Sequence, residues 1–356
     1  MPSSKEQVVD AIIIGGGLAG MHLALMMDRA GLDVAVIDRP DPSCASRIAA
    51  GIINPITGRR FALSWLYDHL SPVFKEVYRY WEEQWHDRFF FSRNIYRSVP
   101  HNKLVNDLDA KLSDPAYKIH CRSMTSVEIQ SASGMVDFVE PGYVMHGYQL
   151  DTVRFLENAK AHFKSKNRFV EAPFQPIAEV LGKRSFSYEG FESDRLILAN
   201  GAAVARETPF QWVRMKPNKG EVAIVHIPEC SNTDIIKQSA YYIPMADEKW
   251  WIGTFDTWEM DQSPTSPGLE YLQEKTNVIK PAHRIIDHLA AIRPAVEDRR
   301  PVIGAHPEND HLYLFNGFGS KGTSLIPFFA KMFVEHIKHD LPIMAEVDVR
   351  RFWPVT

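Results

Sequence analysis

The sequence has little cysteine and no long apolar run. Three cysteines, Cys44, Cys121 and Cys230, are spread over 356 residues, and without a CxxC pair they suggest neither a disulfide framework nor a metal site. No segment approaches the roughly 20 apolar residues of a membrane-spanning helix, and residues 1–9 lack the apolar core of a signal peptide. We therefore expect a cytoplasmic protein with no membrane span and no metal ion.

The sequence also lacks a surplus of positive charge. Lysine and arginine number 40 against 44 aspartates and glutamates, and the resulting net charge of −4 argues against a general nucleic-acid binder. An apolar content of 45% and a charged content of 24% are ordinary for a globular chain, and the length favours two domains. We expect a small-molecule partner and no nucleic acid.

Residues 10–39 carry the most informative pattern. An apolar, β-branched run over 11–14 is typical of a strand buried on both faces. Gly15, Gly17 and Gly20 follow in the spacing GxGxxG. Gly15 permits a tight turn, Gly17 lets the backbone approach a pyrophosphate, and Gly20 lets the next helix pack close to the strand.

The continuation of this stretch completes a dinucleotide-binding pattern. A helix over 18–30 is expected to aim its first N–H groups at the phosphates. A strand over 34–37 then leads to Asp38, where a carboxylate accepts hydrogen bonds from a ribose. The alternative is an ordinary strand–helix–strand turn whose glycines are needed for sterics alone. The expected cofactor contacts in this stretch are Gly15, Gly17, Leu18, Ala19, Gly20, Asp38 and Arg39.

The rest of the chain alternates between helical and strand-like segments. Apolar residues recur at helical spacing in 61–85 and after Asp151, which predicts a helix in each. A polar helix is also predicted over 267–280, followed by a second helix over 281–291. Short alternating runs within 88–145, among them SVEIQSA at 126–132, and within 213–260 predict strands of a mainly antiparallel sheet. The fold class is therefore α/β.

The strand-rich segments interleave with the nucleotide-binding ones, so we expect two domains that are each discontinuous in sequence. The cofactor-binding domain is predicted to comprise residues 1–85, 146–212 and 292–356. The substrate-binding domain is predicted to comprise residues 86–145 and 213–291.

Four separated motifs resemble one family. They are GGGLAG…VIDR, SRIAAGIINP, LILANGA and IRPAVEDRRPVIG…NGFGSKGTSLIP, and their order and spacing are similar to those of the D-amino acid oxidase/glycine oxidase family. The resemblance implies an FAD-binding, Rossmann-like, doubly wound domain with an interleaved, mainly antiparallel β substrate domain. It also implies a flavoenzyme that oxidises the C–N bond of a small amino acid or N-methyl amino acid. Our hypothesis for this oxidation is hydride transfer to the flavin.

A second Gly-rich turn, near the C-terminus, is expected to hold the flavin. Its glycines would let backbone N–H groups point into a cavity, and the helix after Thr323 adds the positive end of a dipole, which stabilises a reduced flavin. The alternative is a Gly-containing helix start in a loop. No cysteine follows Cys230, so the FAD is expected to be non-covalent. The expected contacts are Gly317, Gly319, Ser320, Lys321, Gly322 and Thr323.

The resemblance adds cofactor contacts in two further segments. In the family, the region after the ribose-binding strand touches the pyrophosphate or the flavin. This implies that Ser46 and Arg47 lie at the phosphates and that Ala50 and Gly51 pass close to the flavin ring. Gly201, at the end of LILANGA, is also expected at the cofactor.

Arg293 and Tyr241 are the main candidates for substrate binding. Arg293 matches the arginine that pairs with the substrate carboxylate in glycine-oxidase-like proteins, and a guanidinium grips a carboxylate through two parallel hydrogen bonds. The alternative is a structural arginine paired to Glu297 or Asp298. Tyr241 matches a family tyrosine whose hydroxyl donates to the same carboxylate or lines the pocket. Tyr242 is expected to face the other side of the strand, and a buried structural role for Tyr241 is the alternative.

Two positions depart from the family pattern. Many relatives carry Arg-Asn-Gly where this chain has Ser320, Lys321 and Gly322, and a lysine there places charge near the flavin or substrate without a bidentate fork. We therefore include Lys321 among the catalytic candidates. Some sarcosine-oxidase-like relatives have an oxygen-activating lysine where Trp251 stands. The sequence thus leaves the substrate side chain and the electron acceptor open.

Three rival functions stay open. SRIAAGIINPITGRR and the aromatic helix after it also resemble the oxidase half of tRNA methylaminomethyl-uridine modification enzymes, although the net charge counts against this reading. A 2-hydroxy-acid or glycerol-phosphate dehydrogenase would need a base for the hydroxyl proton, and the sequence offers no clear one. The third rival is a flavin-binding module without turnover.

Overall fold

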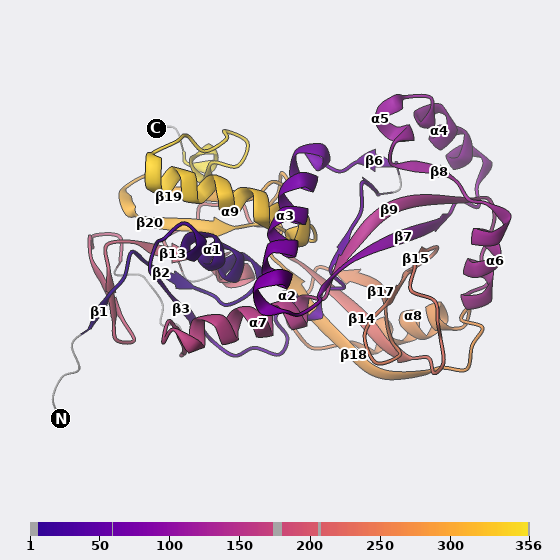
Figure 1. Cartoon of the computed structure of the whole chain (residues 1–356), viewed down its shortest axis with the longest axis horizontal. Coiled ribbons are helices and arrows are strands. Elements are labelled where there is room, and N and C mark those ends of the chain that lie inside the picture. Colours follow the sequence, from indigo (N-terminus) through magenta and orange to yellow (C-terminus); the bar gives the residue numbers. More distant parts are fainter. Residues whose placement is uncertain (1–5, 59, 174–179, 206–207, 355–356) are drawn as a thin grey trace.

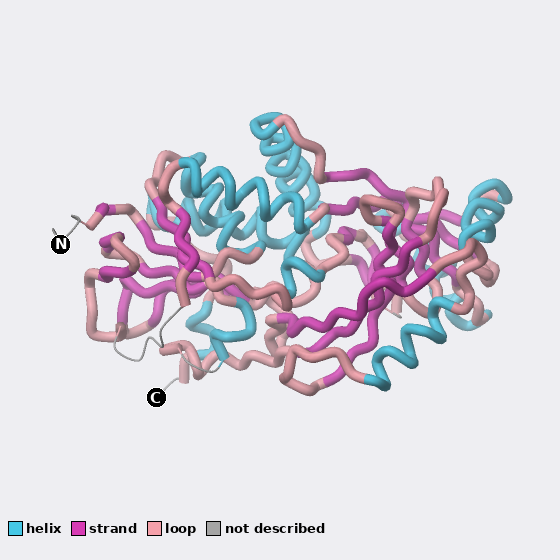
Figure 2. Tube along the Cα trace, turned by 90° about the horizontal axis from the view of Figure 1, so that it is seen from below, coloured by secondary structure: helices cyan, strands magenta, loops and turns pink. Residues whose placement is uncertain are grey.

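The computed structural model describes residues 6–58, 60–173, 180–205 and 208–354. Two large β-sheets lie toward opposite ends of an elongated molecule, and both termini lie at the end that carries the first sheet (Figure 1). Figure 2 shows the strands of the two sheets as separate groups, with helices stacked along one face of the first.

The first sheet is built around the N-terminal part of the chain. Its six strands follow the order β10-β3-β2-β13-β20-β19, and all neighbours are parallel except β19, which pairs antiparallel with β20 at the edge. Every residue of β2 is buried, as predicted for a strand covered on both faces. The strands are β2 (Ala11–Ile14), β3 (Val34–Asp38), β10 (Phe169–Glu171), β13 (Leu196–Leu198), β19 (Val302–His306) and β20 (Asn309–Asn316).

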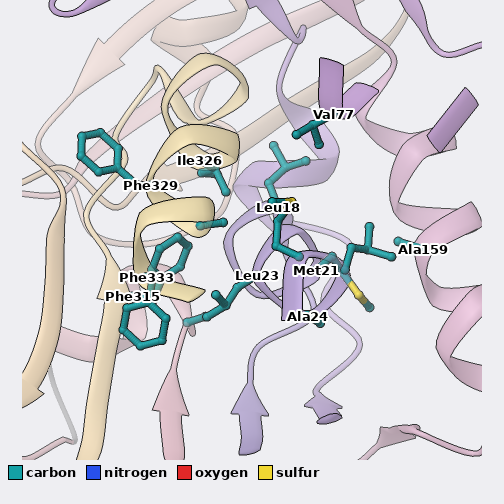
Figure 3. Packing of buried hydrophobic residues seen from close by; sticks show 14 of the residues in the cluster. Leu18, Met21, Leu23, Ala24, Val77, Ala159, Phe315, Ile326, Phe329 and Phe333 are labelled. Atoms are coloured by element: carbon teal, nitrogen blue, oxygen red, sulfur yellow. The ribbon is translucent and has the colours of Figure 1, made fainter. Parts of the chain in front are cut away.

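One face of the first sheet is covered by helices. The N-terminal helix α1 packs against both α7 and the C-terminal helix α9, and α3 packs against α9. In Figure 3, Leu23 of α1 lies beside Phe333 of α9, within one apolar cluster of the two helices. The covering helices are α1 (Leu18–Arg29), α3 (Tyr67–Trp85), α7 (Thr152–Ser165) and α9 (Gly322–His339).

The opposite face of the first sheet is covered mainly by short strands and turns. Phe186, Phe191, Val204 and Val349 from these elements are buried against the sheet in a second apolar cluster. The covering elements are β1 (Gln7–Val8), β11 (Phe186–Tyr188), β12 (Phe191–Ser193) and the 3₁₀ turns η1 (Gly201–Ala205) and η2 (Val349–Phe352).

The second sheet is larger and mainly antiparallel. Its order is β18-β14-β17-β16-β15-β7-β9-β4, with β8 beside β9, and β15 and β7 are its parallel pair. The strands are β4 (Ile52–Ile53), β7 (Phe90–Ser98), β8 (Cys121–Ser123), β9 (Gly142–Leu150), β14 (Asn218–His226), β15 (Ile235–Lys237), β16 (Tyr241–Pro244), β17 (Lys249–Thr257) and β18 (Arg284–Arg293).

The two faces of the second sheet have different partners. Helices α6 and α8 pack on one face, and the β5–β6 hairpin packs with α2 and α4 on the other. These elements are α2 (Ala45–Ile48), β5 (Ile56–Thr57), β6 (Ala62–Leu63), α4 (Asn102–Leu112), α5 (Pro115–Lys118), α6 (Ser126–Met135) and α8 (Ser266–Thr276). A Rossmann-like sheet combined with a mainly antiparallel sheet confirms the predicted α/β fold class.

In some segments the pattern of apolar and polar residues predicted the wrong type of secondary structure. Residues 281–291, predicted as a helix, form most of β18, because its ladder with β14 outweighs the helix preference of its alanines. Residues 126–132, predicted as a strand, lie in α6. Thr125 and Glu128 form a capping box at the start of α6. This helix signal was overlooked because apolar and polar residues alternate in the same segment. Helices α4 and α5 likewise occupy part of 88–145.

A buried polar contact joins three helices near the start of α9. Tyr78 of α3 donates a hydrogen bond of 2.7 Å to the carbonyl oxygen of Thr323. Nε2 of His22 lies 3.1 Å from the same tyrosine hydroxyl, and Nδ1 of His22 lies 2.7 Å from the carbonyl oxygen of Leu18. Burial lowers the pKa of His22 to about 4, so its ring is neutral at pH 7.

This histidine predicts a loss of stability in mild acid. The pKa of His22 is lower in the folded state than in the unfolded state, so the unfolded state takes up a proton first as the pH falls from about 6.5 to about 4. Over that window the free energy of unfolding should fall by about 3 kcal/mol on account of this residue. Urea unfolding should give a flatter pH profile for His22→Gln, whereas His69→Gln, at an exposed position, should keep the wild-type slope. Equal slopes in all three proteins would contradict this assignment.

Candidate active site

One large cavity lies between the two sheets. Its volume is about 1360 Å³, which exceeds the 300–1,000 Å³ typical of a pocket for one small ligand and leaves room for a dinucleotide together with a substrate. The carboxyl ends of β2, β3, β13 and β20 open into it from the first sheet, and β14, β16, β17 and β18 line it from the second. All the predicted site residues line this cavity except Gly20 and Gly317.

The turn before α1 is as tight as its glycines predict. Gly15 has a φ of +113°, and a Cβ atom there would lie 2.5 Å from the carbonyl oxygen of Ala199. A Cβ atom at Gly20 would lie 1.9 Å from the carbonyl oxygen of Gly15, so Gly20 acts through close packing of helix on strand. Gly17, Leu18 and Ala19 thereby present the positive end of α1 to the cavity, a site suited to a pyrophosphate.

Asp38 lies at the end of β3, beside this turn. Its Oδ1 accepts a hydrogen bond of 2.8 Å from the N–H of Gly16, and its Oδ2 lies 3.1 Å from Nζ of Lys160 on α7. A Cβ atom at Gly16 would lie 2.7 Å from the Asp38 carboxyl carbon, so Gly16 is needed as well. Gly16 and Lys160 were not found from the sequence, because their role depends on the position of the carboxylate. Arg39 follows Asp38 and lines the same end of the cavity.

The segment around α2 closes the cavity from another side. Ser46 Oγ accepts a hydrogen bond of 3.0 Å from the N–H of Leu18, at the positive end of α1. Arg47 lines the cavity, 3.7 Å from the carboxylate of Glu157. Ala50 also lines it. At Gly51 a Cβ atom would lie 1.8 Å from a carbonyl oxygen of β9, so glycine is needed here for close packing on β9, and the approach of Gly51 to the flavin ring stays a prediction.

The C-terminal Gly-rich turn differs in detail from the prediction. The N–H groups of Gly317 and Gly319 were expected to point into the cavity, but they donate to Asn316 Oδ1 at 2.8 Å and to the Pro294 carbonyl oxygen at 3.1 Å. These glycines instead supply left-handed backbone, with φ of +81° and +54°. The first turn of α9 instead places Gly322 and Thr323 at the cavity, and their N–H groups have no hydrogen-bond partner among the described residues.

A buried hydrogen-bond acceptor at the first sheet also indicates a ligand in the cavity. Oδ1 of Asn200, which follows β13, has no hydrogen-bond partner within the described residues, and Asn200 lines the cavity beside Gly201. Leaving a buried acceptor unpaired is costly unless a ligand supplies the donor. The two helix N-termini, the crowded glycines and this unpaired oxygen fit a dinucleotide cofactor.

Arg293 lies at the end of β18 and reaches across the second sheet. Its Nη1 donates a hydrogen bond of 2.7 Å to Oδ1 of Asp256 on β17. To get there the guanidinium crosses Gly220 of β14, where a Cβ atom would lie 2.1 Å from Nη2. Neither Glu297 nor Asp298, the predicted structural partners, pairs with Arg293. Asp256 and Gly220 were missed because the sequence does not show which strands neighbour β18.

Tyr241 and Tyr242 face opposite sides of β16, as predicted from strand alternation. The Tyr241 hydroxyl lies at the cavity and accepts a hydrogen bond of 3.3 Å from Nδ2 of Asn54, a residue missed from the sequence. Burial raises the pKa of Tyr241, so the hydroxyl stays protonated and can donate a hydrogen bond to a ligand. Tyr242 donates to the carbonyl oxygen of Lys275 on the other face.

Lys321 is a half-buried cation at the start of α9. Its Nζ lies 3.4 Å from Thr57 Oγ1 and 3.5 Å from Ser64 Oγ, two hydroxyls that the sequence did not point to. Burial, with Arg300 and Arg299 nearby, lowers the pKa of Lys321. Across the described ranges no carboxylate lies within ion-pair distance of its Nζ, so a negatively charged ligand group would supply the missing partner.

Trp251 contributes a large apolar side chain to the cavity lining. Its side chain is buried and its Nε1 donates a hydrogen bond of 2.8 Å to the carbonyl oxygen of Ile48.

No group of three or more His, Cys, Asp or Glu side chains in the described part of the chain is arranged to hold a metal ion. None of the helices searched among those residues is long and apolar enough to cross a membrane.

The chain belongs to the DAO family, described as FAD dependent oxidoreductase, whose family model matches residues 10–336. It is therefore an enzyme that uses FAD, and the resemblance seen in its motifs is confirmed. Its residues fit the cofactor at both helix termini described above.

Individual relatives are distant. Glycine oxidase of Pseudomonas putida is 23% identical over 94% of this chain and 95% of its own length. The structure of glycine oxidase from Geobacillus kaustophilus superposes with a TM-score of 0.79 at 18% identity, covering 97% of this chain and 98% of that one. The tRNA 5-methylaminomethyl-2-thiouridine biosynthesis bifunctional protein of Acinetobacter baylyi is 22% identical over 94% of this chain but only 53% of its own length. The structural likeness shows the fold, and the substrate is a separate question.

The packing at Gly20 gives a direct test of the cofactor turn. Gly20→Ala should lower the free energy of unfolding by about 3 kcal/mol and abolish FAD retention, because the new methyl group meets the Gly15 carbonyl. Gly134→Ala, in α6 with nothing within 4 Å of the added Cβ, should stabilise by up to about 1 kcal/mol and keep FAD. Urea unfolding and the flavin absorbance of the purified variants measure both. Retention of FAD by Gly20→Ala would contradict the assignment.

Proposed function

We propose that this enzyme oxidises the C–N bond of a small amino acid or N-methyl amino acid, with hydride transfer to non-covalent FAD. One observation carries the proposal. A single cavity holds the N-termini of α1 and α9, suited to the two ends of FAD, together with Arg293 and Tyr241 on the facing sheet. The names of the relatives, among them glycine oxidase, are consistent with such a substrate.

In this proposal the chain works mainly by positioning. Arg293 binds the substrate carboxylate through the part of its guanidinium that Asp256 does not use, and the protonated hydroxyl of Tyr241 donates to the same group. Lys321 adds positive charge near the start of α9. The buried side chains of Ile243 and Trp251 keep water from that side of the cavity.

The chemistry needs little acid–base help from the protein. Bound FAD supplies the acceptor for the hydride and its two electrons. The amino acid binds as the zwitterion, and its ammonium group loses a proton to solvent before the reaction. The lone pair of the resulting neutral amine assists departure of the α-hydrogen, and the imine that forms is released to hydrolysis by water. This fits a cavity in which no histidine lies among the lining residues.

The role of Arg293 is tested by its removal. Arg293→Met should raise KM for carboxylated substrates by about a hundredfold, because a charged hydrogen-bonded pair worth roughly 2–3 kcal/mol is lost. Substrates are first found by anaerobic bleaching of the flavin with a panel of amino acids and N-methyl amino acids, and admission of air then tests for peroxide.

Arg214→Met provides the matched control, since Arg214 is 71% exposed and pairs with Glu297 outside the cavity. It should leave KM unchanged. An unchanged KM in Arg293→Met would remove Arg293 from substrate binding.

Oxidation of a modified tRNA uridine is the second candidate, supported by the match to the tRNA-modifying relative over about half of that protein. Retention of labelled tRNA on a filter by the holoenzyme would favour it over a small amino acid.

Two further expectations stay predictions. They are the cytoplasmic location and the discontinuous domains, which comprise residues 1–85, 146–212 and 292–356 in one and residues 86–145 and 213–291 in the other.

A further inference from the structure

The proposed carboxylate-binding arginine already has an anionic partner inside the cavity. Arg293 Nη1 donates to Asp256 Oδ1 at 2.7 Å, and both side chains line the cavity. The Asp256 side chain is 57% exposed and that of Arg293 is 20% exposed, so the aspartate is the more accessible of the two. The pair as a whole has no net charge.

The position of the pair is fixed by three neighbouring strands. Gly220 of β14 pairs with Asp256 of β17 on one side and with Ala291 of β18 on the other. The missing side chain at Gly220 lets the guanidinium lie across β14, since a Cβ atom there would be 2.1 Å from Nη2. Arg293 and Asp256 both line the cavity, and their mutual hydrogen bond leaves the other N–H groups of the guanidinium and Oδ2 of the carboxylate available to a ligand. In the described residues Oδ2 has no hydrogen-bond partner.

Such a pair discriminates by charge. A plain carboxylate that approaches Arg293 also meets the negative charge of Asp256, which opposes binding. An amino acid brings a carboxylate for Arg293 and an ammonium group for Asp256, so both charges of the pair gain a partner. A 2-hydroxy acid offers a neutral hydroxyl in place of the ammonium group and gains less.

We propose that Asp256 is a specificity-determining residue that makes the site select zwitterionic amino acids over plain carboxylates and 2-hydroxy acids. The inference rests on the proposed binding of the substrate carboxylate to Arg293. In this arrangement the carboxylate of Asp256 recognises the amino group of the substrate.

Two isosteric probes test the inference without turnover. 2-Aminoisobutyrate has no hydrogen on its α-carbon and therefore cannot be oxidised there, and 2-hydroxyisobutyrate replaces its ammonium group by a hydroxyl. Binding of each to the FAD-loaded protein is measured from the change in flavin absorbance. The wild-type protein should prefer the amino probe, and Asp256→Asn should reduce the ratio of the two affinities by about tenfold, with a gain for the hydroxy probe.

The control variants separate charge, fold and function. Asp256→Glu should keep the preference for the amino probe, and Asp310→Asn, an 88% exposed aspartate on β20, should leave both affinities unchanged. If Asp256→Asn loses FAD, Asp256→Ser serves as the neutral variant. An affinity ratio that is the same in the wild type and the neutral variant overturns the role of Asp256 alone. Failure of the wild-type protein to bind either probe overturns the proposed carboxylate site at Arg293, and the inference with it.

Discussion

The pairing of β13 with β2 on one side and with β20 on the other is the constraint on which the rest of the molecule depends. It places strands from the two ends of the chain in one parallel sheet, and it brings the first turns of α1 and α9 to the same cavity. Ligands bind at the carboxyl edge of such sheets because the helices that follow the strands present free N–H groups there. Tyr78 of α3 links these two helices, since its hydroxyl donates to the Thr323 carbonyl oxygen of α9 and lies 3.1 Å from His22 Nε2 of α1.

The second sheet contributes an arginine–aspartate pair to the cavity lining. Arg293, Gly220 and Asp256 come from three adjacent strands, so their arrangement follows from strand register rather than from loop conformation. Lys321 approaches from the start of α9 with hydroxyl groups as its neighbours. The site therefore combines one arginine paired with an aspartate and one lysine that lacks an ion-pair partner in the described chain.

The sequence predicted the parts of the site that are local. The GxGxxG turn, the position of Asp38 after β3 and the opposite facing of Tyr241 and Tyr242 depend on spacing alone, and the structure places these residues as expected. It did not predict Asp256, because the partner of Arg293 is set by pairing between strands far apart in the chain. The wrong prediction of a helix over 281–291 has the same origin. Its alanines favour a helix, and the sequence does not show that this edge strand pairs with β14.

The amount of FAD bound per chain tests the central claim most directly. Purified protein, stripped of cofactor and then titrated with FAD, should take up one FAD per chain, with quenching of tryptophan emission because Trp251 lines the cavity. A protein that stays colourless and shows no change in emission when FAD is supplied would contradict the account. It would mean that the two ends of the chain do not meet around a flavin.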